Sequence, residues 1–106
     1  MTLRLENKIA IITGASGGIG RAVALSYLSE GAKVLLTDKE KNQDSLFQEY
    51  FENGRAINIL GDISDRKVIN EIVSKTIDQF DKVDILFNCG YKSLQIINSG
   101  IVLEEL

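Results

Sequence analysis

The glycine-rich segment 13–20, Thr-Gly-Ala-Ser-Gly-Gly-Ile-Gly, most constrains what this chain can fold into. Residues 8–13 form an apolar, β-branched run, which is typical of a strand buried on both faces of a parallel sheet. Residues 18–30 favour a helix. A strand followed at once by glycines and a helix begins a strand–helix–strand unit, and we call residues 13–20 the glycine loop.

The same alternation continues along the chain. Short apolar runs predict further strands at 33–37, 56–60 and 83–88, and apolar residues at helical spacing predict helices over 46–51 and 65–80, the latter with Ser64 as its N-cap. Right-handed connections then give an α/β Rossmann-type parallel sheet with strand order 3-2-1-4. The first two helices should cover one face and the third helix the other. Residues 91–106 show no decisive period, so we expect mostly loop, with a short helix at most at the end.

Composition narrows the function classes. A net charge of -3 gives no basic surface for nucleic acid, and no apolar stretch is long enough for a signal peptide or a membrane span. We therefore expect no nucleic-acid partner, no membrane association and a cytoplasmic location. The absence of histidine and the single cysteine argue against a metal site and against histidine-based catalysis.

The glycine loop has the features that a pyrophosphate requires. Gly14 would permit the tight turn, Gly18 would let the main chain approach the phosphates, and Gly20 would let the helix pack closely on the strand. The spacing departs from G-x-G-x-x-G, because three residues separate Gly14 from Gly18. The strand–helix context favours a phosphate cradle over a plain loop.

Two acidic residues lie where the next strands end. Asp38 follows the second strand about twenty residues after the glycine loop, where a carboxylate can accept hydrogen bonds from the adenosine ribose. That charge would repel a 2′-phosphate, which favours NAD, whereas the adjacent Lys39 leaves NADP open. Asp62 follows the third strand and could accept from the adenine amino group while Ile63 packs on the ring; alternatively, it is a simple acid at a helix start.

These motifs together resemble the short-chain dehydrogenase/reductase family. The matching features are the loop 13–20, the acid after strand two, Gly-Asp-Ile-Ser-Asp at 61–65 and Asp-Ile-Leu-Phe-Asn-Cys-Gly at 84–90. The resemblance implies a Rossmann fold and hydride transfer between NAD(P) and an alcohol or carbonyl. It also implies roles in holding the cofactor for the following residues: Gly14, Ser16, Gly17, Gly18, Ile19, Gly20, Asp38, Asp62, Ile63, Asn88 and Gly90.

Two departures limit what the resemblance implies. The family's Asn-Asn-Ala-Gly motif is one residue short at Asn88-Cys89-Gly90, and Cys89 is better explained as a small residue under the cofactor than as a catalytic thiol. The family's Tyr-x-x-x-Lys is missing, because glycine or glutamine stands four residues after each of the tyrosines at 27, 50 and 91. We therefore assign no catalytic residue.

The resulting hypothesis is a single NAD(P)-binding Rossmann domain over residues 1–106 that is incomplete at its C-terminal end and inactive by itself. A broken gene, a frameshift near Gly90 or an incomplete gene model would each produce such a chain. A non-catalytic nucleotide-binding or assembly module is one alternative, and an S-adenosylmethionine-dependent methyltransferase fragment is a weaker one. The exposed sheet edge at strand four predicts aggregation, a homo-oligomer or dependence on a partner chain.

Overall fold

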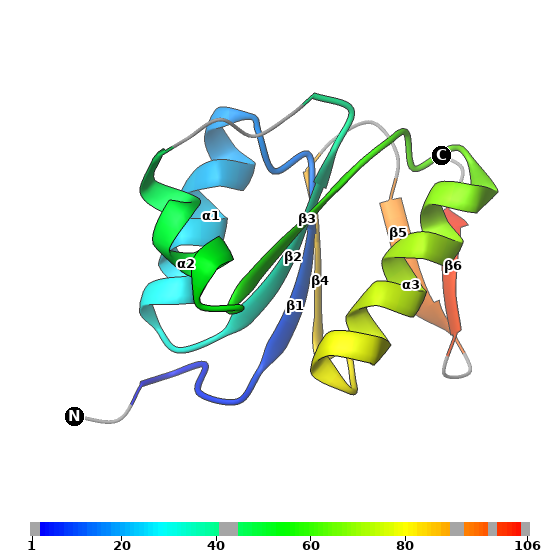
Figure 1. Ribbon diagram of the computed structural model, residues 1–106. Coiled ribbons are helices and arrows are strands. Elements are labelled where there is room, and N and C mark those ends of the chain that lie inside the picture. Colours follow the sequence, from blue (N-terminus) through cyan, green and yellow to red (C-terminus); the bar gives the residue numbers. More distant parts are fainter. Residues whose placement is uncertain (1–2, 41–44, 90–92, 98–99, 105–106) are drawn as a thin grey trace.

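The computed structural model describes residues 3–40, 45–89, 93–97 and 100–104. Strands and helices alternate over the first part of this range, as predicted (Figure 1). The elements are β1 (Ile9–Thr13), α1 (Gly18–Ser29), β2 (Lys33–Asp38), the 3-10 turn η1 (Ser45–Phe47), α2 (Gln48–Glu52), β3 (Ala56–Leu60), α3 (Arg66–Phe80), β4 (Ile85–Asn88), β5 (Ser93–Ile97) and β6 (Gly100–Glu104).

Within the described residues, the first four strands form one parallel sheet in the order β3-β2-β1-β4. This confirms the predicted strand order. The register aligns Thr13 at the end of β1 with Thr37 of β2 and with Asn88 of β4. The carboxyl ends of all four strands therefore meet at one edge, which is where ligands bind in sheets of this kind.

The sheet separates two apolar cores. Ala10, Ile12, Val34 and Leu36 point to one face and pack with buried residues from α1 and η1, whereas the alternate strand residues pack with Ile69 and Ile72 of α3 on the other face. Figure 1 shows α1 and α2 on one side of the sheet and α3 on the opposite side. Successive side chains along a strand point to opposite faces of the sheet. Because these strands are apolar on both faces, each face has its own core.

Two local expectations are wrong. Residues 93–97 and 100–104 form an antiparallel pair of strands, β5 and β6, rather than loop and helix, because this segment is rich in isoleucine, valine and leucine, which favour strands. The N-cap of α3 is Asp65 rather than Ser64: the Asp65 side chain accepts from the Lys67 amide at 2.9 Å. The Ser64 hydroxyl donates to Asp62 Oδ1.

Candidate cofactor site

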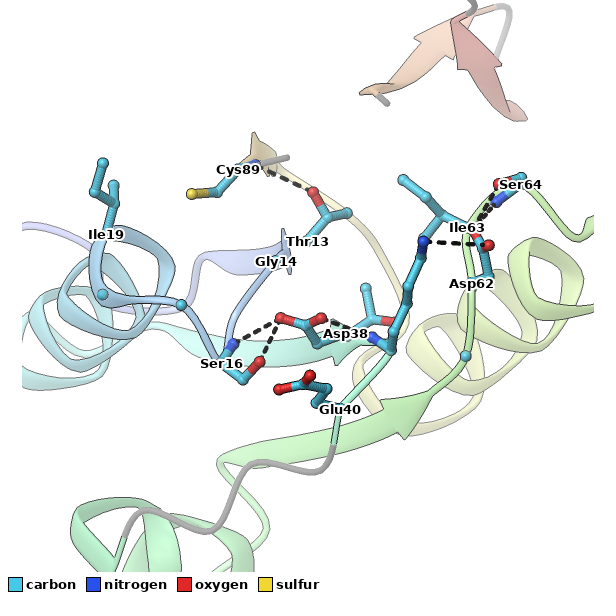
Figure 2. A pocket seen from close by; sticks show the side chains of 15 residues that line it. Thr13, Gly14, Ser16, Ile19, Asp38, Glu40, Asp62, Ile63, Ser64 and Cys89 are labelled. Carbon is cyan, nitrogen blue, oxygen red and sulfur yellow. Dashed lines mark hydrogen bonds and ion pairs between the residues drawn. The ribbon is translucent and has the colours of Figure 1, made fainter. Parts of the chain in front are cut away.

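A cleft of about 600 Å³ opens at the carboxyl ends of β1, β2 and β3, beside the start of α1 (Figure 2). Most of the predicted site residues line it, from Gly14 to Ile63 along the sequence, whereas Gly20 and Asn88 lie outside its lining. Gly90 lies outside the described residues. The lining comprises Thr13, Gly14, Ser16, Gly17, Gly18, Ile19, Thr37, Asp38, Lys39, Glu40, Gly61, Asp62, Ile63, Ser64 and Cys89.

Three glycines of the loop meet different surroundings. Gly14 has a φ of 64°, and a Cβ built on it would lie 1.6 Å from the carbonyl oxygen of Cys89. A Cβ on Gly20 would lie 2.3 Å from the carbonyl oxygen of Gly14, so its absence allows α1 to pack against the loop. A Cβ on Gly18 would meet nothing within 4 Å. Gly18 therefore faces space that a ligand can fill.

The first turn of α1 presents hydrogen-bond donors to the cleft. The helix begins at Gly18, and its N-cap, Gly17, makes no side-chain capping bond. The first amides of an α-helix have no acceptor within the helix, and they lie at the positive end of its dipole. Gly18 and Ile19, both in the cleft lining, are the first two helical residues. An anionic group, such as a phosphate, suits this position.

Asp38 connects the end of β2 to the glycine loop (Figure 2). Its Oδ2 accepts from the Ser16 amide at 3.0 Å and from the Ser16 hydroxyl at 2.5 Å, and its Oδ1 accepts from the Lys39 amide at 2.7 Å. Partial burial raises the pKa of Asp38, but the hydrogen bonds from Ser16, Lys39 and Glu40 together outweigh burial and hold the pKa below its usual value. The carboxylate is therefore charged at neutral pH.

Asp62 follows β3 on the same rim of the cleft. Its Oδ1 accepts from the hydroxyl of Ser64 at 2.5 Å and from its amide at 2.9 Å, and its Oδ2 lies 3.5 Å from the Lys39 ammonium. The bonds from Ser64, assisted by Lys39, lower the pKa of Asp62 to about 2. Because Oδ1 already has two donors, a ligand amino group would approach Oδ2, the oxygen that Lys39 holds.

Two threonines on neighbouring strands lie at the base of the cleft. Thr13 Oγ1 accepts from the Cys89 amide at 3.2 Å, which holds the end of β4 against the end of β1. Thr37, its register neighbour, is fully buried, and within the described part of the chain its hydroxyl has no hydrogen-bond partner. Thr37 was not among the predicted site residues, because a threonine inside a strand is usually a packing residue.

Sequence reasoning also missed the contacts of Lys39 and Ser64. Lys39 was considered only as a cation next to Asp38 that leaves NADP open, whereas the structure pairs it with Asp62. A Ser two residues after an Asp is a known signal for a local side-chain turn, and Asp62-Ile63-Ser64 contains that signal.

No group of three or more residues suited to hold a metal ion occurs in the described portion. None of the helices described there is long and apolar enough to span a bilayer.

A parallel sheet with a glycine loop, an uncapped helix start and an acid at the end of the second strand defines a dinucleotide-binding type of fold. The comparison with protein families agrees: residues 8–98 match the family model for short chain dehydrogenase. The chain belongs to the short-chain dehydrogenase/reductase family.

Individual relatives support this assignment. The chain is 39% identical over 106 residues to the 3-oxoacyl-(acyl-carrier-protein) reductase FabG of Thermotoga maritima, covering 98% of this chain and 39% of that protein. Among solved structures, it resembles a short-chain dehydrogenase/reductase (glucose/ribitol dehydrogenase) of Brucella melitensis, with a TM-score of 0.72, 31% identity and coverage of 81% and 37%. It also resembles a 3-ketoacyl-(acyl-carrier-protein) reductase of Brucella melitensis complexed with NADH, with a TM-score of 0.68, 34% identity and coverage of 77% and 34%. The chain thus spans less than two fifths of the length of these relatives.

Proposed function

We propose that this chain binds NAD(H) in the cleft at the carboxyl ends of its strands, as one domain that covers residues 1–106. The observation that carries this proposal is that the uncapped start of α1, with open space over Gly18, lines the same cleft as the Asp38 carboxylate. Gly18 and Ile19 would hold the pyrophosphate, and Asp38 would face the adenosine ribose. Asp62 and Ile63 would hold the adenine, and the motif that contains Asn88 and Gly90 would steady the central sheet beside the cofactor. When bound, the cofactor supplies the hydride.

NAD rather than NADP is the cofactor that the charges favour. The Asp38 carboxylate would repel a 2′-phosphate, and the cation nearest in sequence, Lys39, is directed toward Asp62 at 3.5 Å.

We further propose that this chain does not catalyse turnover by itself. Carbonyl reduction requires a proton donor near the developing alkoxide, and no tyrosine of the chain has a lysine four residues later. The whole protein would then act as an oxidoreductase on an alcohol or carbonyl, and the chain alone as a nucleotide-binding module. Family membership leaves no support for the S-adenosylmethionine alternative. We also propose that the protein is cytoplasmic and that the chain depends on a partner chain. Fractionation tests the location, and co-purification tests the partner.

The decisive experiment is titration of the chain with NADH, NADPH and S-adenosylmethionine by calorimetry. NADH should bind most tightly, and Gly18→Val should abolish that binding without unfolding the chain, because the new side chain enters open space that the phosphates need. Ser74→Val, an exposed change on α3 away from the cleft, is the matched control and should bind like the unchanged chain. Unchanged affinity in Gly18→Val would refute the assignment of the phosphate site.

The DNA sequence provides a separate test of whether the missing catalytic motif is encoded after this chain. Translation of the three forward frames after codon 88 should reveal Tyr-x-x-x-Lys if a frameshift separates this chain from an intact gene. Its absence from every frame would refute that origin, and NADH oxidation by the purified chain would refute the lack of catalysis.

A further inference from the structure

Two consecutive residues of the glycine loop, Ala15 and Ser16, donate hydrogen bonds to the end of β2. The Ala15 amide donates to the Thr37 carbonyl at 3.3 Å, and the next amide, that of Ser16, donates to the Asp38 carboxylate at 3.0 Å. The Ser16 hydroxyl adds a bond of 2.5 Å to the same carboxylate oxygen. Figure 2 shows both bonds converging on one oxygen of Asp38. Asp38 is therefore engaged with the loop through two bonds from Ser16.

These bonds limit what Asp38 and Ser16 can offer a ligand. A carboxylate oxygen has two acceptor positions, so Oδ2 is saturated by Ser16, while the amides of Lys39 and Glu40 also donate to the carboxylate. The Ser16 amide, in turn, is not available to a phosphate. The donors left for the phosphates lie two and three residues further on, at Gly18 and Ile19.

We infer that Asp38 is a positioning residue for the phosphate-binding half of the glycine loop, acting through Ser16, in addition to facing the ribose. This inference rests on the proposed function. The carboxylate fixes Ser16, and Ser16 fixes the point from which the chain turns into α1. Loss of the carboxylate releases the loop, so that Gly18 and Ile19 no longer hold their donors in the arrangement that a phosphate needs.

The sign of the effect separates this role from simple electrostatics. A negative charge near the phosphates repels them, so removal of the Asp38 charge alone should strengthen the binding of any ligand that lacks ribose contacts to Asp38. Loss of positioning has the opposite result. The two explanations therefore predict changes of affinity in opposite directions for the same variant and ligand.

The test compares NADH with its 2′,3′-dideoxyadenosine analogue, which has no adenosine ribose hydroxyl. Calorimetry on the unchanged chain, Asp38→Ala, Asp38→Asn and Ser16→Ala gives the affinities. For the analogue, we expect Asp38→Ala to bind about tenfold more weakly, as for the loss of a charged hydrogen bond. Asp38→Asn should recover part of the loss, because its amide oxygen still accepts from Ser16. Ser16→Ala should show a smaller loss, because it keeps the amide.

Hydrogen exchange of the Ser16 amide provides a readout that needs no ligand. It should be faster in Asp38→Ala than in the unchanged chain, whereas the amides of α3 should keep their exchange rates. A general loss of stability would accelerate both sets. If Asp38→Ala does not fold, the near-isosteric Asp38→Asn, together with Ser16→Ala, tests the same order of affinities.

Affinity of Asp38→Ala for the analogue equal to or above that of the unchanged chain would overturn the inference and leave Asp38 with the ribose alone. Failure of the unchanged chain to bind either ligand would refute the proposed function instead. In that case the exchange rate of the Ser16 amide still decides whether Asp38 fixes the loop.

Discussion

Replacement of Gly14 by alanine should be one of the most damaging single changes in this chain, and the structure allows its cost to be divided. A left-handed φ of 64° costs a residue with a Cβ about 1–2 kcal/mol. The new Cβ would lie 1.6 Å from the Cys89 carbonyl oxygen, so the end of β4 has to retreat by roughly 1.5 Å or more. Such overpacking costs about 1–3 kcal/mol, and loss of the Cys89–Thr13 hydrogen bond adds about 1 kcal/mol.

Three other glycines isolate each contribution. Gly54 has a φ of 80° with nothing within 4 Å of a built Cβ, so Gly54→Ala carries the backbone cost alone, about 1 kcal/mol. Gly20→Ala carries only steric overlap, at 2.3 Å from the Gly14 carbonyl oxygen, and should cost about 2 kcal/mol. Gly18→Ala has neither problem and should leave stability within about 0.5 kcal/mol.

Thermal and urea denaturation followed by circular dichroism measure these differences. The total for Gly14→Ala is about 3–6 kcal/mol, which lowers Tm by at least about 12 °C in a domain of this size. The expected order of stability is Gly18→Ala, Gly54→Ala, Gly20→Ala and Gly14→Ala, from highest to lowest. If Gly14→Ala unfolds at the same temperature as Gly54→Ala, then the contact with Cys89 costs nothing and the packing of the loop against β4 described above is wrong.

The remaining predictions concern other parts of the chain. Arg55→Ala should destabilise the fold by about 2 kcal/mol in urea denaturation, because its guanidinium donates to the Leu28 carbonyl near the end of α1 at 2.6 Å and to the Ala32 carbonyl directly before β2 at 3.0 Å; an unchanged midpoint would contradict this. The carboxyl of Asp62 should titrate at about 2 by NMR, and Ser64→Ala should raise the midpoint toward 3.8. Because this pKa is lowered on folding, its stabilisation is present above pH 3.8 and is lost as the pH falls through 2. The strand β4 pairs only with β1 within the described sheet, so sedimentation should show self-association; a monomer with a sharp thermal transition would count against it.

The sheet could be predicted because the sequence patterns that indicate its strands and helices are local. Each strand is a short apolar run, each helix has its own period, and the right-handed connection rule then leaves one strand order. The prediction of loop and helix failed at 93–97 and 100–104, which form a pair of strands although their apolar residues follow no single period. It also failed at Ser64, because the helix begins one residue later than predicted and the adjacent Asp65, an equally good capping residue, accepts from the Lys67 amide.

The site was predictable as a set of residues but not as a set of contacts. Glycine spacing and the acids after strands two and three marked the lining of the cleft, since parallel strands place their carboxyl ends together. The bonds from Ser16 to Asp38 and the ion pair between Lys39 and Asp62 join residues 22 and 23 positions apart, and side-chain geometry rather than any pattern selects them. That the Thr37 hydroxyl finds no hydrogen-bond partner among the described residues likewise becomes visible only once its neighbours are in place.

The glycine loop is held from both sides of β1, and this explains why one segment can serve the fold and the ligand. Toward β4, the close approach of Gly14 to Cys89 fixes its beginning, and toward β2, Asp38 fixes Ser16. Both attachments involve residues before Gly18. The contacts that hold the loop against the sheet therefore end before the residue that faces open space. Changes before Gly18 should therefore lower stability and binding together, whereas changes at Gly18 should lower binding alone.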